Sequence, residues 1–340
     1  MALTINTNVS SLIAQRNLNS ATNALNTSIE RMTTGYKINH AADNAAGYSI
    51  SAMWETQLGS LEIAANNAAT GADMLTTAEE TYGLLTDHLQ RVRDLTEQAA
   101  NGTYGSQSLR AIQAEVVARL KEVDRIAANS EFNGIKLMAF TGANDGSGIK
   151  TTGVNLQVGL YANEHSNINL HTDLFKDASV HGIFKGLTTT PEGNTKSLAE
   201  MMESGGGAGV TVADLGDDDT AVKEKAMQAF AAACCGMQYT GTDLQLSDTS
   251  AKEMLAYLDA GINEISGRVT KIGAAQNRVE SALAALDVQS QNITSSLSTL
   301  RDTDVAKESS NYIQAQILQQ ASATLLSTAN QLPSIALNLV

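Results

Sequence analysis

The clearest pattern in the sequence is a row of apolar positions near the C-terminus, spaced alternately by three and four residues. Ten of its twelve positions are apolar over 39 residues. This spacing draws one narrow stripe along a helix of about 58 Å, and such a stripe requires a partner helix. The row consists of Ile262, Ile265, Val269, Ile272, Gln276, Val279, Leu283, Leu286, Ser290, Ile293, Leu297 and Leu300.

The N-terminal half supplies a partner with the same seven-residue repeat. Its helix stops at the turn pair Asn101-Gly102, and a third amphipathic helix follows and closes near Asn133-Gly134. Two long helices from opposite ends of the chain, with a shorter one folded back, predict a rod-like bundle. The repeat positions are Ala68, Leu75, Tyr82 and Leu89 in one row, Ala78, Leu85, Val92 and Ala99 in the other, and Leu109, Ile112, Val116, Val123 and Ile126 in the third helix.

Between the helical halves the period changes from helical to alternating. The runs 155–161 and 167–172 alternate with period two, which predicts a β-hairpin. Residues 179–254 are heterogeneous and contain a helical run at 221–235, which indicates a small inserted α/β domain. The predicted fold class is therefore mainly α, a long antiparallel helical coiled-coil bundle built from both chain ends, with a β-hairpin and that insert.

The two ends of the chain are almost free of charge. Residues 309–340 contain no charged side chain in 32 residues, and residues 1–29 contain only Arg16. A surface helix normally keeps charges on its outer face, so these ends predict burial against other copies of the chain. Soluble disordered tails are the alternative, but they should carry more charge. Periodic apolar positions predict this polymerisation core: Leu18, Leu25 and Met32, and then Ile317, Leu318, Leu325 and Leu332.

Composition excludes several other classes of function. The net charge is −14 and no cluster of Lys and Arg occurs, so no nucleic-acid partner is expected. Aromatic residues are only 4% of the chain, which favours thin cores between long helices. No run of 18 apolar residues exists, so no membrane insertion is expected, and the N-terminus shows none of the features of a secretory signal peptide.

Candidate catalytic and metal-binding residues do not form a known arrangement. The five histidines contain no His-Glu-x-x-His, and no phosphate-binding loop or nucleophile elbow occurs. Cys234 and Cys235 are adjacent, which favours two buried or half-buried thiols over a strained vicinal disulfide. Asp302 and Asp304 are expected to cap a helix. We therefore expect no enzyme activity, no metal and no cofactor.

Several ordered motifs at both ends closely resemble bacterial flagellins. The resemblance covers roughly residues 1–175 and 255–340, about three quarters of the chain. The matching segments are Ile29–Asn39, Asp43–Gly47, Leu89–Leu95, Gln98–Gly102 and Glu131–Leu137, and then Ile272–Arg278, Asp302–Asp304, Ala315–Ala321 and Ala329–Pro333. Where the family usually carries a lysine before the Asp-x-Ala-Ala-Gly stretch this chain has Ala42, so the connecting loop is expected to make different contacts.

The resemblance implies a secreted filament subunit that is exported through the flagellum's own channel and located in the extracellular filament. Residues 1–43 and 302–340 would form the inner core, 44–178 and 255–301 the helical rod, and 179–254 a variable outer domain. Implied partners are copies of the chain, an export chaperone and the filament cap. A hook–filament junction protein is an alternative, and an enzyme domain within 179–254 is a more remote one.

The resemblance also implies recognition by a host receptor, Toll-like receptor 5. The positions matching the family's receptor contacts are Arg91, Leu95, Ile112 and Glu115. A guanidinium and a carboxylate flanking two apolar side chains make a reasonable contact surface. The alternative is that Leu95 and Ile112 pack the rod while the two charged residues stabilise helix surfaces. Both can hold, because the same face would pack between subunits.

Overall fold

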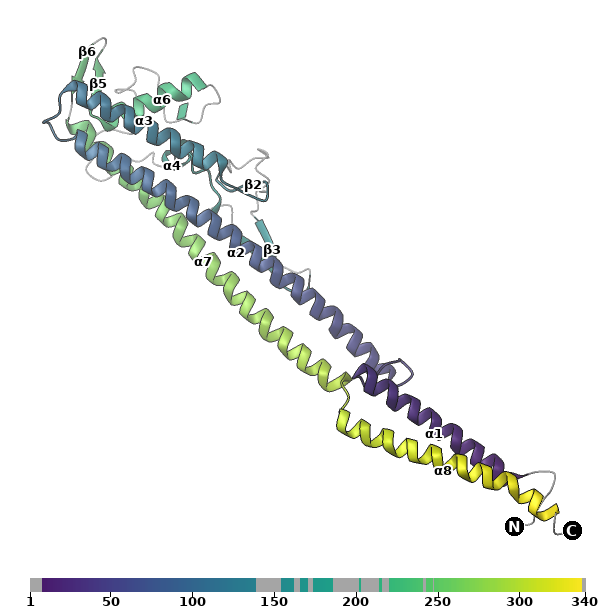
Figure 1. Cartoon of the computed structure of the whole chain (residues 1–340). Coiled ribbons are helices and arrows are strands. Elements are labelled where there is room, and N and C mark those ends of the chain that lie inside the picture. The colour runs from purple at the N-terminus through teal and green to yellow at the C-terminus, as the bar shows by residue number, and fades with distance from the viewer. Residues whose placement is uncertain are drawn as a thin grey trace. The chain divides into compact units, whose positions relative to one another are not determined.

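The computed structural model describes residues 8–138, 154–161, 166–170, 174–185, 202, 214–215, 220–240, 243–246 and 248–337. The chain divides into two compact units, Met1–Glu62 with Asp287–Val340, and Ile63–Leu286. The division falls within two long helices, α2 (Ala45–Ala99) and α7 (Asp248–Arg301). Each unit is described separately below (Figure 1).

In the unit Ile63–Leu286, α2 and α7 pack against each other along the predicted apolar rows. Leu75, Tyr82 and Leu89 of α2 and Ile265, Ile272 and Val279 of α7 are fully buried in one continuous core. Two polar contacts fix an antiparallel register, Gln276 Nε2 to Glu79 Oε2 at 2.8 Å and Arg93 Nε to Asp259 Oδ1 at 2.6 Å. The predicted antiparallel bundle is confirmed.

A third helix, α3 (Ser106–Asn129), folds back onto this pair, with four of its five predicted positions buried and Ile126 half-buried. It ends four residues before the position that the sequence predicted. Asn133 and Gly134 instead have positive φ values of 50° and 79° and form the turn between β1 (Glu131–Phe132) and β2 (Ile135–Lys136). An Asn-Gly pair suits a two-residue hairpin loop, and here that preference outweighed its use as a helix stop.

The predicted β-hairpin is confirmed as β3 (Val154–Gln157) paired antiparallel with β4 (Asn167–Leu170). It packs on α2 at Gly71, where an added Cβ would lie 2.2 Å from the Leu156 side chain. Asn67 Nδ2 also donates to the carbonyl oxygen of Gln157 at 3.2 Å. The absence of a side chain at position 71 therefore allows the hairpin to pack closely against the helix.

The described part of the insert packs on α3. It contains α4 (Val180–Phe184), α6 (Thr220–Cys234) and the hairpin β5 (Met237–Thr240) with β6 (Asp243–Leu246). Asp124 of α3 joins two of these elements, because Oδ1 accepts from the Val180 backbone N–H at 2.8 Å and Oδ2 lies 2.8 Å from Lys223 Nζ. These contacts confirm a small inserted region; most of residues 186–219 lie outside the described part of the chain.

In the other unit, α1 (Val9–Thr34) lies antiparallel to α8 (Val305–Leu337) (Figure 1). Asn8 caps α1 by accepting from the Ser11 backbone N–H, and Gly35 ends it in the left-handed conformation with φ 77°. Asp304 caps α8 by accepting from two backbone N–H groups through Oδ1, at 2.9 and 3.2 Å. The predicted capping role is confirmed for Asp304.

Candidate functional site

The contact between α1 and α8 is made by small side chains. On α1 the buried positions are Ala14, Ala21 and Ser28, spaced by seven residues. On α8 the buried positions share this repeat, at Glu308, Ala315, Ser322 and Ala329. Because most of these side chains are small, the backbones of the two helices approach each other closely along the contact. The two helices therefore pair closely through small side chains and leave most of their large apolar side chains exposed.

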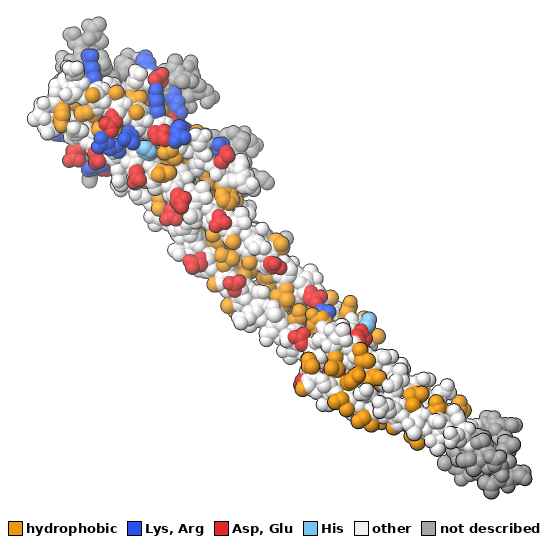
Figure 2. Space-filling model, in the orientation of Figure 1, with side chains coloured by type: hydrophobic (Ala, Val, Ile, Leu, Met, Phe, Trp, Pro, Cys, Tyr) orange, Lys and Arg blue, Asp and Glu red, His pale blue; other side chains and the backbone are white. Residues whose placement is uncertain are grey.

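Those large apolar side chains lie on the outer faces of the pair instead. Leu12 is 60% exposed, Ile317 59% and Leu325 62%. The orange surface of this part of the chain in Figure 2 shows how much of the visible face is apolar. The exposed set on the two helices is Val9, Leu12, Ile13, Ile29, Met32, Val305, Ile313, Ile317, Leu318 and Leu325.

Some of the residues predicted for a polymerisation core lie along the α1–α8 contact, and others lie on the exposed outer faces of the two helices. Leu18 and Leu25 are half-buried along the α1–α8 contact. Met32, Ile317, Leu318 and Leu325 are exposed. Leu332 lies in α8, but its side chain is outside the described part of the chain. The sequence did not distinguish the small residues of the contact from the large ones beside it, although the repeat of Ala14, Ala21 and Ser28 could have done so.

A groove of about 720 Å³ runs along one side of the α1–α8 contact. Small and polar residues of both helices form its floor, and Leu318 and Leu325 line it from α8. Arg31 also lines the groove, and its Nε is buried without a hydrogen-bond partner among the described residues. The groove therefore combines polar and apolar side chains of both helices.

The loop that connects α1 to α2 lies beside the loop that connects α7 to α8, and backbone hydrogen bonds join the two loops. The Lys37 backbone N–H donates to the Arg301 carbonyl oxygen at 2.7 Å, and that of Thr303 donates to the Gly35 carbonyl oxygen at 2.8 Å. The Arg301 guanidinium stacks 4.0 Å from the Tyr36 ring centroid and pairs with Glu55. We call these two segments, 35–44 and 302–304 with Arg301, the joint.

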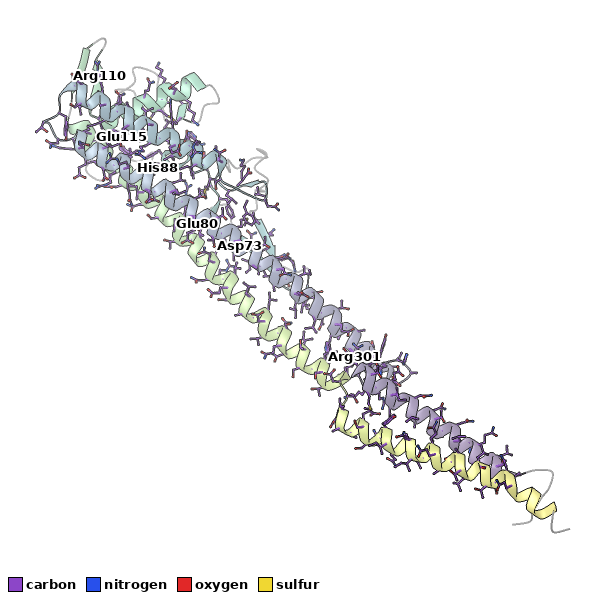
Figure 3. All side chains as sticks on the ribbon, viewed as in Figure 1. Asp73, Glu80, His88, Arg110, Glu115 and Arg301 are labelled. Carbon is purple, nitrogen blue, oxygen red and sulfur yellow. The ribbon has the colours of Figure 1, made fainter. Side chains whose placement is uncertain are left out.

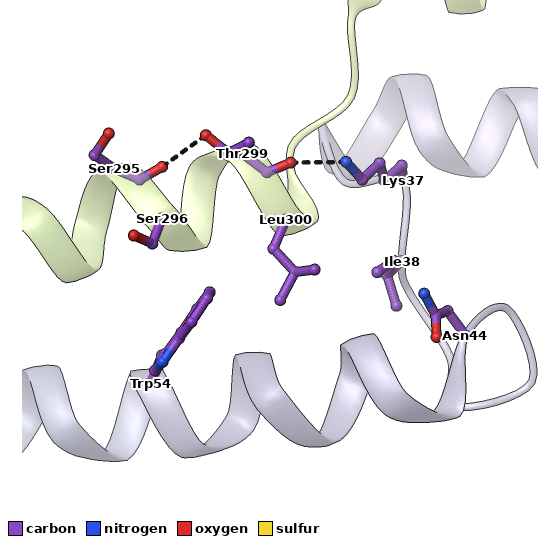
Figure 4. Close-up of a pocket in the computed structure, with 8 residues that line it drawn as sticks. All are labelled: Lys37, Ile38, Asn44, Trp54, Ser295, Ser296, Thr299 and Leu300. Atoms are coloured by element: carbon purple, nitrogen blue, oxygen red, sulfur yellow. Dashed lines mark hydrogen bonds between the residues drawn. The ribbon is translucent and has the colours of Figure 1, made fainter.

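A pocket of about 560 Å³ lies beside the joint, with Trp54 opposite Ser296 and Leu300 (Figure 4). Lys37 Nζ donates to the Thr299 carbonyl oxygen at its rim, at 2.8 Å. The Asp43 carboxylate accepts from the backbone N–H groups of His40 and Asn39, which hold the pKa of Asp43 below its ordinary value. Arg301 and Asp43 organise this loop, and sequence inspection singled out neither for that role.

The four residues matched to receptor contacts are brought together on α2 and α3. Arg91 and Glu115 form an ion pair at 2.9 Å, and their side chains are 47% and 38% exposed. Leu95 and Ile112 are 2% and 8% exposed and belong to the core. Glu115 is labelled in Figure 3, which shows it on α3. The accessible part of this set is therefore the ion pair, with the two apolar side chains beneath the surface.

The inserted cysteines are free thiols buried at the end of α6. Removal from water raises the pKa of the Cys234 thiol to about 12, and burial also raises the pKa of Cys235. The prediction of two buried thiols is confirmed. Among the described residues no cluster of histidine, cysteine and carboxylate side chains could hold a metal ion, and none of their helices is long and apolar enough to span a membrane.

Comparison with known proteins matches both helical ends. The model of the bacterial flagellin N-terminal helical region matches residues 5–143, and that of the bacterial flagellin C-terminal helical region matches residues 255–340. Polar flagellin F of Vibrio parahaemolyticus is 34% identical over 380 residues, with 100% of both chains covered. The chain belongs to the bacterial flagellin family.

A second full-length relative of this flagellin is flagellin B of Vibrio cholerae, 32% identical over 376 residues with 100% of both chains covered. Among solved structures, a crystal structure of Bacillus cereus flagellin aligns with a TM-score of 0.39 at 19% identity, covering 65% of this chain and 88% of that chain. Residues 144–254 of this flagellin lie outside both matched family regions, and they include the insert that carries Cys234 and Cys235.

Proposed function

We propose that this chain is the structural subunit of a flagellar filament, and that the paired helices α1 and α8 form the core buried between copies. The observation that carries the proposal is the division of their side chains. Alanine and serine make most of the contact within the chain, while most of the large leucine, isoleucine and valine side chains are exposed outside it. A soluble chain gains nothing from this placement unless another surface covers it.

The free energy available from covering this surface is large. Burying a Leu or Ile side chain completely contributes about 1.5–3 kcal/mol, so burying an exposed half contributes about 1 kcal/mol. Ten such side chains on α1 and α8 are 38–62% exposed. Their burial would therefore contribute on the order of 10 kcal/mol for each subunit added, before the cost of ordering the ends. That gain supports assembly driven by the terminal helices.

The test is polymerisation of purified protein on neutralisation from acid, followed by light scattering and negative-stain microscopy. Ile317→Gln and Leu325→Gln should each prevent filament growth while circular dichroism of the monomer stays unchanged. Gln320→Ser, an exposed polar change on the same helix, is the matched control and should polymerise normally. Deleting residues 309–340 should abolish assembly and leave the rod folded. Normal filaments from the deleted chain would refute the proposal.

The same assay separates the filament subunit from a hook–filament junction protein. A junction protein would add to existing ends but would not extend a filament of its own kind. We expect continuous growth from seeds. Secretion through the flagellar channel, an export chaperone and the filament cap follow as further parts of the proposal, and they are tested by export assays in a flagellated host strain.

A second candidate function is recognition of the monomer by Toll-like receptor 5. The accessible ion pair of Arg91 and Glu115 over buried Leu95 and Ile112 favours it. Arg91→Ala should reduce signalling in a receptor reporter assay without unfolding the rod, because an exposed ion pair contributes little to stability. Arg110→Ala, an exposed arginine on α3, is the control. Unchanged signalling by Arg91→Ala would refute receptor contact at this position.

A further inference from the structure

Four exposed carboxylates follow one another along α2 at intervals of seven residues. They are Asp73, Glu80, Asp87 and Asp94, and we call them the acidic row. Seven residues make nearly two helical turns, so the row forms one stripe with a spacing of about 10.5 Å. Carboxylates are spaced along the α2 part of the visible face in Figure 2, and Asp73 and Glu80 are labelled in Figure 3.

The carboxylates of the acidic row form no ion pair with a described residue of their own chain, and Asp94 alone interacts electrostatically with the neighbouring Arg93. Other charged residues of α2 are paired: Arg91 with Glu115, and Arg93 with both Asp259 and Glu97. No ion pair or side-chain hydrogen bond joins any carboxylate of the acidic row to another described residue. At 100° per residue, the row lies nearly opposite the buried positions of α2. It therefore faces away from the core of its own unit.

A complementary pair of cations lies on α7 with the same repeat. Lys271 and Arg278 are exposed, are seven residues apart, and likewise form no ion pair with any residue that the structure describes. Gln276, which contacts Glu79 of α2, lies about 140–160° around the helix from both of them. The two cations therefore point away from α2 of the same chain, and we call them the basic pair.

The register of the two helices places the basic pair beside the same stretch of α2 as the acidic row, offset by about half a repeat. The contacts of Glu79 with Gln276 and of Arg93 with Asp259 put Arg278 level with about residue 76 of α2 and Lys271 level with about residue 83. Each cation thus lies at the height of a gap between two carboxylates. Consider a second, parallel copy that is displaced along the helix axis by half a repeat, about 5 Å, or by one further repeat, about 16 Å. Either displacement would bring both cations of one copy level with carboxylates of the other copy.

We propose that the acidic row of one copy contacts the basic pair of a second, parallel copy, so that the two rows set the axial displacement between neighbouring subunits. This inference rests on the proposed filament function and names one lateral contact within it. The shared seven-residue repeat, the opposite charge and the lack of ion pairs with the described residues of the chain carry it. Because the repeat is regular, only discrete displacements satisfy both cations at once.

The test is a pair of charge-reversal variants of the full chain. The first carries Glu80→Lys and Asp87→Lys, which makes the two central positions of its acidic row basic. The second carries Lys271→Glu and Arg278→Glu, so both of its rows are acidic. Each variant alone should show a critical concentration for polymerisation raised about tenfold at low salt. An equimolar mixture should polymerise within about twofold of the unaltered chain, because every contact in an alternating assembly is again between opposite charges.

Two controls make the outcome specific. Glu280→Lys with Asp287→Lys changes the net charge by the same amount as the first variant, at two exposed positions of α7 also seven residues apart. This control should polymerise like the unaltered chain at each salt concentration. Raising the salt concentration to about 0.5 M should reduce the defects of both reversal variants, because exposed charges are screened.

The possible failures are distinguishable. If the unaltered chain does not polymerise, the filament proposal fails and this inference fails with it. If the unaltered chain polymerises and both reversal variants behave like the Glu280 and Asp287 control, the filament proposal stands and the lateral contact is refuted. If each variant alone is defective but the mixture is not restored, the rows do not contact each other and the inference is also refuted.

Discussion

Arg268 is a buried cation whose removal should destabilise the unit Ile63–Leu286. Its side chain is only 4% exposed. Nη1 donates to the carbonyl oxygens of Asp177 at 2.9 Å and Lys176 at 3.4 Å, and Nε donates to Glu264 Oε1 at 3.2 Å. Nearby, the buried Tyr82 hydroxyl donates to the Leu174 carbonyl oxygen at 3.2 Å. Arg268 therefore ties the segment before α4 to the α2–α7 core.

The magnitude follows from these contacts. Arg268→Ala removes one well-formed hydrogen bond from a charged donor to a buried carbonyl group, worth about 1.5–3 kcal/mol, and a weaker one at 3.4 Å. Loss of a large buried side chain adds a cavity, which contributes about 1–2 kcal/mol more. The ion pair with Glu264 adds little, because that carboxylate is 48% exposed. The expected loss of unfolding free energy is the sum of these contributions, about 2.5–5 kcal/mol.

Urea unfolding of the monomer, followed by far-ultraviolet circular dichroism, measures this loss. Lys271→Ala is the matched control, since it lies on the same helix but is exposed, and it should cost less than about 0.5 kcal/mol. Hydrogen exchange should also show faster exchange of the segment 174–185 in Arg268→Ala. A loss below about 1 kcal/mol, with exchange in that segment unchanged, would refute the view that Arg268 anchors it.

Three further predictions concern local features. Gly71→Val should displace the β3–β4 hairpin, because its Cβ would meet Leu156 at 2.2 Å, and hydrogen exchange of Val154–Gln157 should accelerate. Backbone hydrogen bonds lower the pKa of Asp43, so its ionised carboxylate stabilises the loop 39–43 above about pH 4, and this stabilisation is lost as the pH falls through the lowered pKa. Asp43→Asn should therefore reduce the change in tryptophan emission on acidification. An unaltered change in emission would contradict this prediction. Cys234 and Cys235 should react with a thiol reagent at pH 8 only at the rate of unfolding, since burial raises both pKa values; rapid labelling of the folded chain would contradict their burial.

The long helices were predictable because their signal is local and repeated many times. Five and a half heptads between Ile262 and Leu300 leave no strand or loop alternative, and α7 runs unbroken through them. The end of α3 was mispredicted because Asn133-Gly134 suits both a helix stop and a hairpin turn. Only the pairing of Glu131 with Lys136 across that turn decides between them. Such a choice depends on neighbours that a single segment does not reveal.

The candidate site was predictable in its location but not in its division of roles. The charge-free ends identify the assembling region, since charge is read directly from the sequence. The same seven-residue repeat, however, describes both the row that pairs within the chain and the row that is left exposed. The difference lies in side-chain size, as between Ala315 and Ile317. Arg268 was missed for a related reason, because burial of a cation depends on carbonyl groups brought from residues about 90 positions away.

The two helical pairs in this chain differ in a way that fits their proposed roles. In the pair of α2 and α7, the large side chains Tyr82, Leu85 and Leu89 are fully buried, so that part of the molecule gains its hydrophobic free energy as a monomer. In the pair of α1 and α8, alanine and serine fill most of the contact. The hydrophobic free energy of burying the exposed large side chains is therefore not released in the monomer. A helix pair that is weakly stabilised alone but strongly stabilised when covered makes assembly depend on neighbours. Replacing Ala315 with leucine would test this distinction, because a larger side chain should force α1 and α8 apart and impair polymerisation while leaving the unfolding free energy of the α2–α7 core unchanged.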